Sequence, residues 1–231
     1  NDVPLTRARL HQILQDLSAR LLVAFGHQVT LIVHGGAVMV LHRDLHHRQS
    51  TQDVDYIHRA FVAQYRSPDA ETRLRSCIAS TAAVHGLGAD WMNDHADVAL
   101  PWATNPMGQR YDPITHATLS VSDNIIFQAP GLKLLMVPWS WAFALKFVRY
   151  QKEDPRDIAA MLRLGEGQKS IRWDTPTLEK WITDLCWPMG YSNYPPPLLE
   201  QLRERMRHAI SLAGVARSPR HPVMYPPPAT P

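Results

Sequence analysis

The segment Leu31–Gly36, with the sequence LIVHGG, and the segment Ser50–Asp55, with the sequence STQDVD, decide the fold that we expect. The apolar and β-branched run Val29–Val33 predicts a buried strand that ends just before the glycine pair. The apolar residues 37–41 then predict a short helix, and the alternation over residues 53–57 predicts a second strand. A strand, a glycine turn, a helix and a further strand indicate an α/β protein.

The two acids of the second segment are candidates for cation binding. Side chains two positions apart on a strand point to the same face, so Asp53 and Asp55 would project side by side and could share a divalent cation. Gly35 and Gly36 leave backbone N–H groups open to an anion. A metal on one side and amides on the other would hold a triphosphate. The alternative is an ordinary glycine turn beside a surface hairpin that happens to carry two acids.

Working outward, the same kinds of pattern predict the remaining elements. Apolar residues at helical spacing follow Thr6, a suitable N-cap, and the helix should end at Gly26. Residues 86–122 show no sustained period, so we expect irregular structure with short helical turns there. We further expect helices over 5–25, 69–85, 138–150, 154–164, 175–185 and 197–213, and a hairpin of strands 124–128 and 132–137. Asp69 and Asp154 are the expected N-caps of their helices.

Composition excludes several classes of protein. The 231 residues are 45% hydrophobic and 19% charged, enough apolar surface for a packed globule. The net charge of +3 comes from scattered basic residues, which do not indicate nucleic acid. The most apolar stretch, residues 131–148, contains Lys133, Lys146 and Pro138, so we expect no membrane span. Two distant cysteines, Cys77 and Cys186, favour a reducing compartment, and we expect a cytoplasmic protein.

The glycine pair followed by an acid-x-acid strand resembles the nucleotidyltransferase superfamily. The chain looks most similar to the branch that includes the abortive-infection-type toxin nucleotidyltransferases and related bacterial and fungal proteins. In that branch a later helix carries a lysine and an arginine, and an acid follows. Residues 144–149 (ALKFVR) and 154–157 (DPRD) are similar to that part, so the resemblance covers roughly residues 29 to 165.

The resemblance implies a fold and a set of roles. The fold would be a small mixed sheet flanked by helices over residues 1–165, followed by a helical annex over 166–214 and a proline-rich tail over 215–231. The implied roles are Mg²⁺ binding for Asp53 and Asp55, phosphate binding for Gly35, Gly36 and Lys146, and an auxiliary acid role for Asp157. We extend the nucleotide-binding set to Ser50, Thr51 and Arg149, the last of which lies three residues from Lys146 on one helix face.

These same residues also have structural explanations. A solvated helix edge would account for Lys146 and Arg149, although the rest of that helix is strongly apolar and a lone lysine within it needs a partner. Helix capping alone would explain Asp157. Active members of the superfamily often carry a third acid on a later strand, and strands 124–128 and 132–137 contain none. The fold is therefore a safer prediction than the activity.

The leading prediction is Mg²⁺-dependent transfer of a nucleotidyl group from an NTP to an acceptor hydroxyl, in which positioning and charge neutralisation do most of the work. The acceptor stays open, and nucleic acid is one candidate. One alternative is a repurposed member of the fold whose apolar cleft binds a hydrophobic small molecule and catalyses a cyclisation or rearrangement without metal. The other is a non-catalytic interaction protein.

Overall fold

A five-stranded mixed sheet forms the centre of the computed structural model, which describes residues 2–121 and 124–214. The strand order is β5-β4-β2-β9-β8. Strand β2 is parallel to β9 and antiparallel to β4. Of the outer pairs, β4–β5 is parallel and β8–β9 is antiparallel. The strands are β2 (Val29–His34), β4 (Val54–Tyr56), β5 (Met92–Asn93), β8 (Ile125–Ala129) and β9 (Leu132–Met136). The expected fold class is confirmed.

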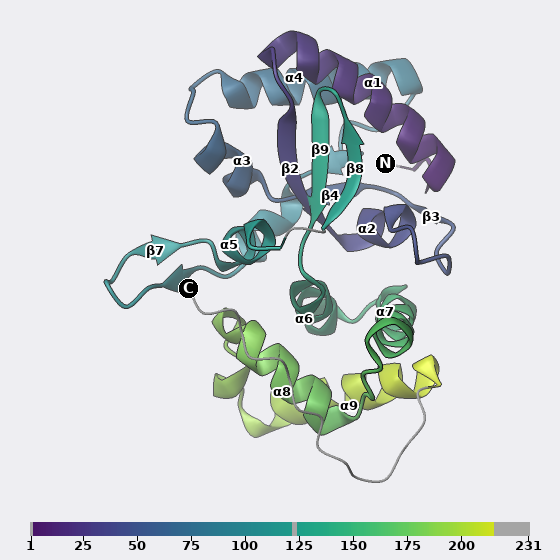
Figure 1. The fold of residues 1–231 in the computed structure, drawn as a ribbon, viewed down its shortest axis with the longest axis vertical. Coiled ribbons are helices and arrows are strands. Elements are labelled where there is room, and N and C mark those ends of the chain that lie inside the picture. Colours follow the sequence, from purple (N-terminus) through teal and green to yellow (C-terminus); the bar gives the residue numbers. More distant parts are fainter. Residues whose placement is uncertain (1, 122–123, 215–231) are drawn as a thin grey trace.

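Helices surround this sheet, and four of them form a separate layer beyond it (Figure 1). Helix α1 packs against α4 and lies over β9 and β2. The helices beside the sheet are α1 (Arg7–Phe25), α2 (Gly35–Leu41), α3 (His58–Gln64), α4 (Ala70–His85) and α5 (Pro113–Leu119). The C-terminal layer contains α6 (Trp139–Arg149), α7 (Asp154–Lys169), α8 (Thr175–Leu185) and α9 (Pro196–Ala213). The remaining short strands are β1 (Leu5–Thr6), β3 (Ser50–Thr51), β6 (Ala103–Thr104) and β7 (Arg110–Tyr111). Short 3₁₀ helices span His95–Ala99, Trp187–Met189 and Tyr191–Asn193.

Several local predictions are confirmed. The Thr6 hydroxyl accepts a hydrogen bond from the Arg9 N–H at 3.3 Å, and Gly26 ends α1 in the left-handed region at φ 73°. The expected helix over residues 175–185 is α8. Strand β2 is buried along most of its length because it has a strand on each side and helices over it.

Other local predictions are wrong. Residues 86–121 contain short helices, as expected, but also β5 and the β6–β7 hairpin, which were not expected, and the hairpin projects from the sheet (Figure 1). The start of α5 had a readable signal, since Asp112 precedes Pro113 and accepts from the Ile114 N–H at 3.0 Å. Asp69 stands at the expected N-cap position of α4, but its side chain pairs with Ser67 and Arg73 instead of capping the helix. Asp154 is the first residue of α7 rather than its N-cap.

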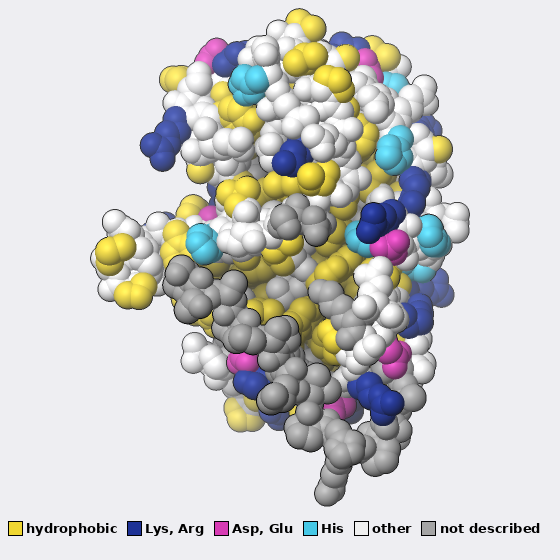
Figure 2. All heavy atoms as spheres, in the orientation of Figure 1, with side chains coloured by type: hydrophobic (Ala, Val, Ile, Leu, Met, Phe, Trp, Pro, Cys, Tyr) yellow, Lys and Arg dark blue, Asp and Glu magenta, His cyan; other side chains and the backbone are white. Residues whose placement is uncertain are grey.

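The domain boundary expected after residue 165 falls inside α7, which is continuous from Asp154 to Lys169. Helices α7 and α9 pack closely together, so the helical layer begins before residue 166. The predicted proline-rich tail, residues 215–231, lies outside the described residues. Within the described residues, no helix combines the length and apolarity that a membrane crossing needs. Lys and Arg side chains are spread over the face shown in Figure 2 and are interspersed with acids.

Candidate functional site

A polar cavity of about 560 Å³ opens where β2 gives way to α2, beside β3 and β4. One wall carries Asp53 and Asp55, and the opposite wall is the connection between α6 and α7, residues 149–154. Gly36, Arg48, Ser50 and Thr51 also line it. The sequence pattern therefore predicted a group of residues that the fold brings into one cavity.

The acid pair, Asp53 and Asp55, lies against the glycine corner, which is the turn at Gly35 and Gly36 between β2 and α2. Asp55 is opposite His34 in the β2–β4 ladder, and Asp53 comes directly before β4. A Cβ atom added to Gly35 would meet the Asp55 carboxylate, and the φ of Gly35 is 73°. Glycine is required at position 35 both for its backbone conformation and to let the carboxylate approach.

The cavity raises the pKa of both acids. For Asp53, burial and the Asp55 charge outweigh the opposing effect of Arg48. For Asp55, burial outweighs Arg149 and Lys146. Within residues 2–121 and 124–214, neither carboxylate has a recorded hydrogen bond or ion pair. Two partly buried, unpaired acids that repel each other are suited to a hard divalent cation, which would favour their charged forms.

The cationic side of the site is held by buried acids. Arg149 lies on the cavity wall and makes a bidentate pair with Asp154, at 2.9 Å through Nε and 2.8 Å through Nη2. Lys146 is only 3% exposed and reaches Asp154 at 3.3 Å and Asp157 at 2.7 Å. Asp157 also receives Arg48 Nη1 at 2.8 Å. These groups form one continuous network from the cavity wall into the interior.

This network changes the roles expected for Lys146 and Asp157. Neither residue is on the cavity wall, so the predicted contact of Lys146 with a phosphate is replaced by its contact with two carboxylates. Burial alone would raise the pKa of Asp157, but hydrogen bonds from His47 and Lys146 hold the pKa below its usual value. Asp157 is therefore an ionised partner of cations and a poor proton carrier.

Sequence reasoning missed the pairing of Arg48 and His47 with Asp157 and the ion-pair role of Asp154. The loop that holds Arg48 and His47 favoured an exposed polar segment, with contact to a nucleotide base or phosphate as the alternative, and Asp157 is distant in sequence. The only available signal was the position of Arg48 just before the acid-bearing segment. Among the described residues, no acid on a strand other than Asp55 lines the cavity, and Asp53 lies directly before that strand. The same residues contain no cluster of three or more His, Cys, Asp or Glu side chains that could bind a metal.

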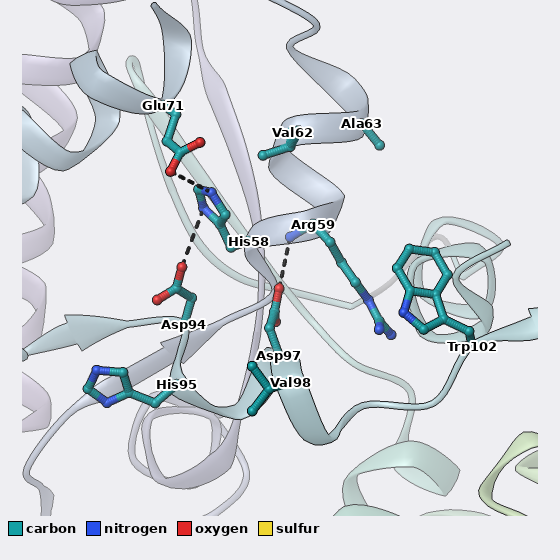
Figure 3. Close-up of a pocket in the computed structure, with 10 residues that line it drawn as sticks. All are labelled: His58, Arg59, Val62, Ala63, Glu71, Asp94, His95, Asp97, Val98 and Trp102. Carbon is teal, nitrogen blue, oxygen red and sulfur yellow. Dashed lines mark hydrogen bonds and ion pairs between the residues drawn. The ribbon is translucent and has the colours of Figure 1, made fainter. Parts of the chain in front are cut away.

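Three acids outside these strands, Asp94, Asp97 and Asp123, were further candidates from the sequence for a third acid of the site. Asp94 and Asp97 lie in a different cavity of about 700 Å³ (Figure 3). There His58 contacts Glu71 at 3.3 Å, and the Arg59 N–H donates to Asp97 at 2.9 Å. The Arg59 guanidinium in turn pairs with Asp112. These charges largely satisfy one another, so this cavity is a weaker candidate. Asp123 lies outside the described residues.

Comparisons of the chain with protein-family models, with curated proteins and with solved structures gave no match.

Proposed function

We propose that this protein is a Mg²⁺-dependent nucleotidyltransferase that moves a nucleotidyl group from an NTP to an acceptor hydroxyl. The observation that carries the proposal is the pair Asp53 and Asp55, two unpaired carboxylates of raised pKa that share one polar cavity with arginines and a glycine corner. This combination supplies a place for a cation next to a place for phosphates.

Each part of the cavity has a task in this proposal. Asp53 and Asp55 would hold Mg²⁺, which when bound polarises a phosphoryl oxygen and neutralises charge. Arg149, fixed by Asp154, would orient the phosphates from the opposite wall, with Ser50 and Gly36 completing the nucleotide-binding set. Gly35 is not part of the cavity wall and would act by letting Asp55 approach. Lys146 and Asp157 support this wall from behind. The acceptor oxygen would bond to the α-phosphorus as the bond to the pyrophosphate leaving group breaks, and Glu153, the remaining acid of the wall outside the Asp53–Asp55 pair and the Arg149–Asp154 pair, would accept the proton of the hydroxyl.

The polar lining favours this proposal over the repurposed, apolar cleft. No tryptophan of the described chain lines the acid-bearing cavity, and Trp91 and Trp141 are buried in the core. A hydrophobic metabolite would leave the charged side chains of the wall without partners. The interaction-protein alternative is separated from both by the ligand test that follows.

The test is thermal unfolding with Mg²⁺ and an unreactive NTP analogue. A ligand at one hundred times its Kd adds about 2.7 kcal/mol of stability, which raises Tm by roughly 5–10 °C for a chain of this size. The double variant Asp53→Asn/Asp55→Asn should stay folded and lose the shift. Asp184→Asn, in an exposed pair with Lys180, is the matched control and should keep it.

Two results would count against the proposal. One is the absence of any shift with wild-type protein at millimolar analogue and Mg²⁺. The other is full transferase turnover in the double Asn variant.

A cytoplasmic location is part of the same proposal, and it is supported by Cys77 and Cys186, which are both buried free thiols.

A further inference from the structure

The backbone around Arg149 is bound to helix α9. Arg205 of α9 donates from Nη1 to the carbonyls of Phe147 and Val148, at 2.6 Å and 2.9 Å. These two residues precede Arg149 in the last turn of α6, where carbonyls have no partner within the helix. Arg205 therefore satisfies the end of α6 and ties it to α9.

Tyr150, the residue that follows Arg149, is bound to the same helix. Its hydroxyl donates to the Arg205 carbonyl at 3.0 Å and lies 2.8 Å from His208 Nδ1. Because the hydroxyl proton is used by the carbonyl, His208 Nδ1 is the donor in the second bond. The Arg205 guanidinium also lies 5.7 Å from the centre of the Tyr150 ring. Helix α9 thus holds the chain on both sides of Arg149.

The connection between α6 and α7 has a backbone that needs such support. Tyr150 and Lys152 have positive φ, 48° and 50°, although neither is a glycine. This conformation costs free energy for a residue with a Cβ atom, and it persists only where neighbouring contacts fix it. Lys152 itself lines the cavity. Strained non-glycine residues gather at binding sites, so the turn indicates that this wall has a function.

The side chain of Arg149 is held at its far end by Asp154. The Asp154 carboxylate accepts from Arg149 Nε and Nη2, and it also accepts from the Gln151 N–H at 2.9 Å. The guanidinium is therefore fixed by Asp154, and the backbone that carries it is fixed by α9. The Arg149 side chain is nevertheless 56% exposed and lines the cavity. An arginine that is both fixed and accessible is pre-organised for an anion.

We propose that Tyr150 and Arg205 are positioning residues for ligand binding, which act through Arg149 and make helix α9 part of the site. The inference rests on the proposed function, since it takes the phosphates of the NTP as the group that Arg149 binds. Helix α9 then sets the affinity for the nucleotide, although none of its described residues lines the cavity. If the same contacts were only structural, their loss would lower stability without a selective loss of nucleotide binding.

The decisive experiment compares Tyr150→Phe with Tyr191→Phe. Each variant loses a hydroxyl that donates to a backbone carbonyl, and the control bond, from Tyr191 to Ala144 of α6 at 2.8 Å, is buried. The affinity for an unreactive NTP analogue with Mg²⁺, measured by calorimetry, should fall about fivefold or more only in Tyr150→Phe. Mg²⁺ alone, held by the acid pair on the opposite wall, should bind both variants as it binds wild type. Equal losses in the two variants, or a matching loss of Mg²⁺ affinity, would overturn the proposal.

Arg205→Gln is paired with the control Arg163→Gln. Arg163 also donates to a carbonyl near the end of a helix, that of Leu212 in α9 at 3.0 Å. Nucleotide affinity should fall about fivefold or more only in Arg205→Gln. A double-mutant cycle then joins Tyr150 to Arg149: once Arg149→Gln has removed the arginine, Tyr150→Phe should cause no further loss of affinity. Additive losses would show that Tyr150 does not act through Arg149, which contradicts the proposal.

Hydrogen exchange separates this inference from the proposed function. In the protein without ligand, the Gln151 N–H, which donates to Asp154, should exchange faster in Tyr150→Phe and Arg205→Gln than in the two control variants. Faster exchange, combined with no nucleotide binding by the wild type, would reject the proposed transferase and leave the positioning of Arg149 by α9 standing. Nucleotide affinity that is unchanged in both Tyr150→Phe and Arg205→Gln would reject the positioning role and leave the transferase standing. Exchange at the wild-type rate in both variants would also reject the positioning role.

Discussion

One contribution to the loss of stability in acid should come from His34. The residue is 7% exposed at the end of β2, and its Nε2 has no partner within the described residues. Burial, together with the nearby charges of Lys146 and Arg149, lowers the pKa of His34 to about 4, against a smaller opposing effect of Asp53. In the unfolded chain the same imidazole has a pKa of about 6.5.

The sign of the effect follows from which state binds the proton. Between pH 6.5 and pH 4 the unfolded chain holds a proton on His34 that the folded protein does not, so stability rises with pH across this window. The free energy of unfolding then changes by up to about 1.4 kcal/mol per pH unit. Going from pH 7 to pH 5 should therefore remove about 2 kcal/mol, and the whole window about 3 kcal/mol.

Urea denaturation at pH 7, 6 and 5, with EDTA to exclude metal ions, measures this loss. The free energy of unfolding falls by roughly 2–3 kcal/mol per molar urea. The urea midpoint of the wild type should therefore fall by about 0.7–1 M between pH 7 and pH 5 from the effect of His34 alone. The variant His34→Leu, of similar volume, should lose this part of the pH dependence. His11→Gln, at an exposed position of α1, controls for the removal of one histidine. Equal pH slopes for wild type and His34→Leu between pH 5 and pH 7 would refute the reasoning.

Three further variants test the packing of the site by urea denaturation. Asp157→Asn leaves buried cations without a shared partner and should cost about 3–5 kcal/mol, so a loss below about 1 kcal/mol would contradict the network. Gly36→Ala places a methyl group against two side chains and should cost about 1–3 kcal/mol, whereas Gly167→Ala, with nothing within 4 Å, should be neutral or stabilise α7 by up to about 1 kcal/mol. Asp112→Ala removes the cap of α5 and the bidentate partner of Arg59, and should cost about 2–4 kcal/mol; an unchanged midpoint would show that neither contact matters.

The parts of the fold that depend on near neighbours in sequence could be predicted. Helix α1 follows from its apolar spacing, and its ends follow from Thr6 and Gly26. The meeting of Asp55 with the glycine corner was also predictable, because β2 and β4 are adjacent antiparallel strands and His34 lies opposite Asp55. A short helix and one loop separate these strands, so few other arrangements were open to them.

The strands missed are short and depend on distant partners. Strand β5 has two residues and exists because it pairs with β4. Strand β3 likewise pairs with β1, at the start of the chain, and this pairing places Thr51 on the cavity wall. A two-residue strand carries no period that a sequence pattern can reveal, so its place is decided by tertiary contacts.

Lys146 shows how the fold can change the meaning of a correct observation. A lone lysine in an apolar helix does need a partner, and the structure supplies two, Asp154 and Asp157. They reach it because α7 turns back on α6 through a connection in which Tyr150 and Lys152 adopt positive φ. Neither residue is a glycine, so nothing in the sequence marks this turn. The charge of Lys146 therefore acts on the cavity through the acids that also hold Arg48 and Arg149, and a lysine that reads as a ligand-binding residue becomes the anchor of two others.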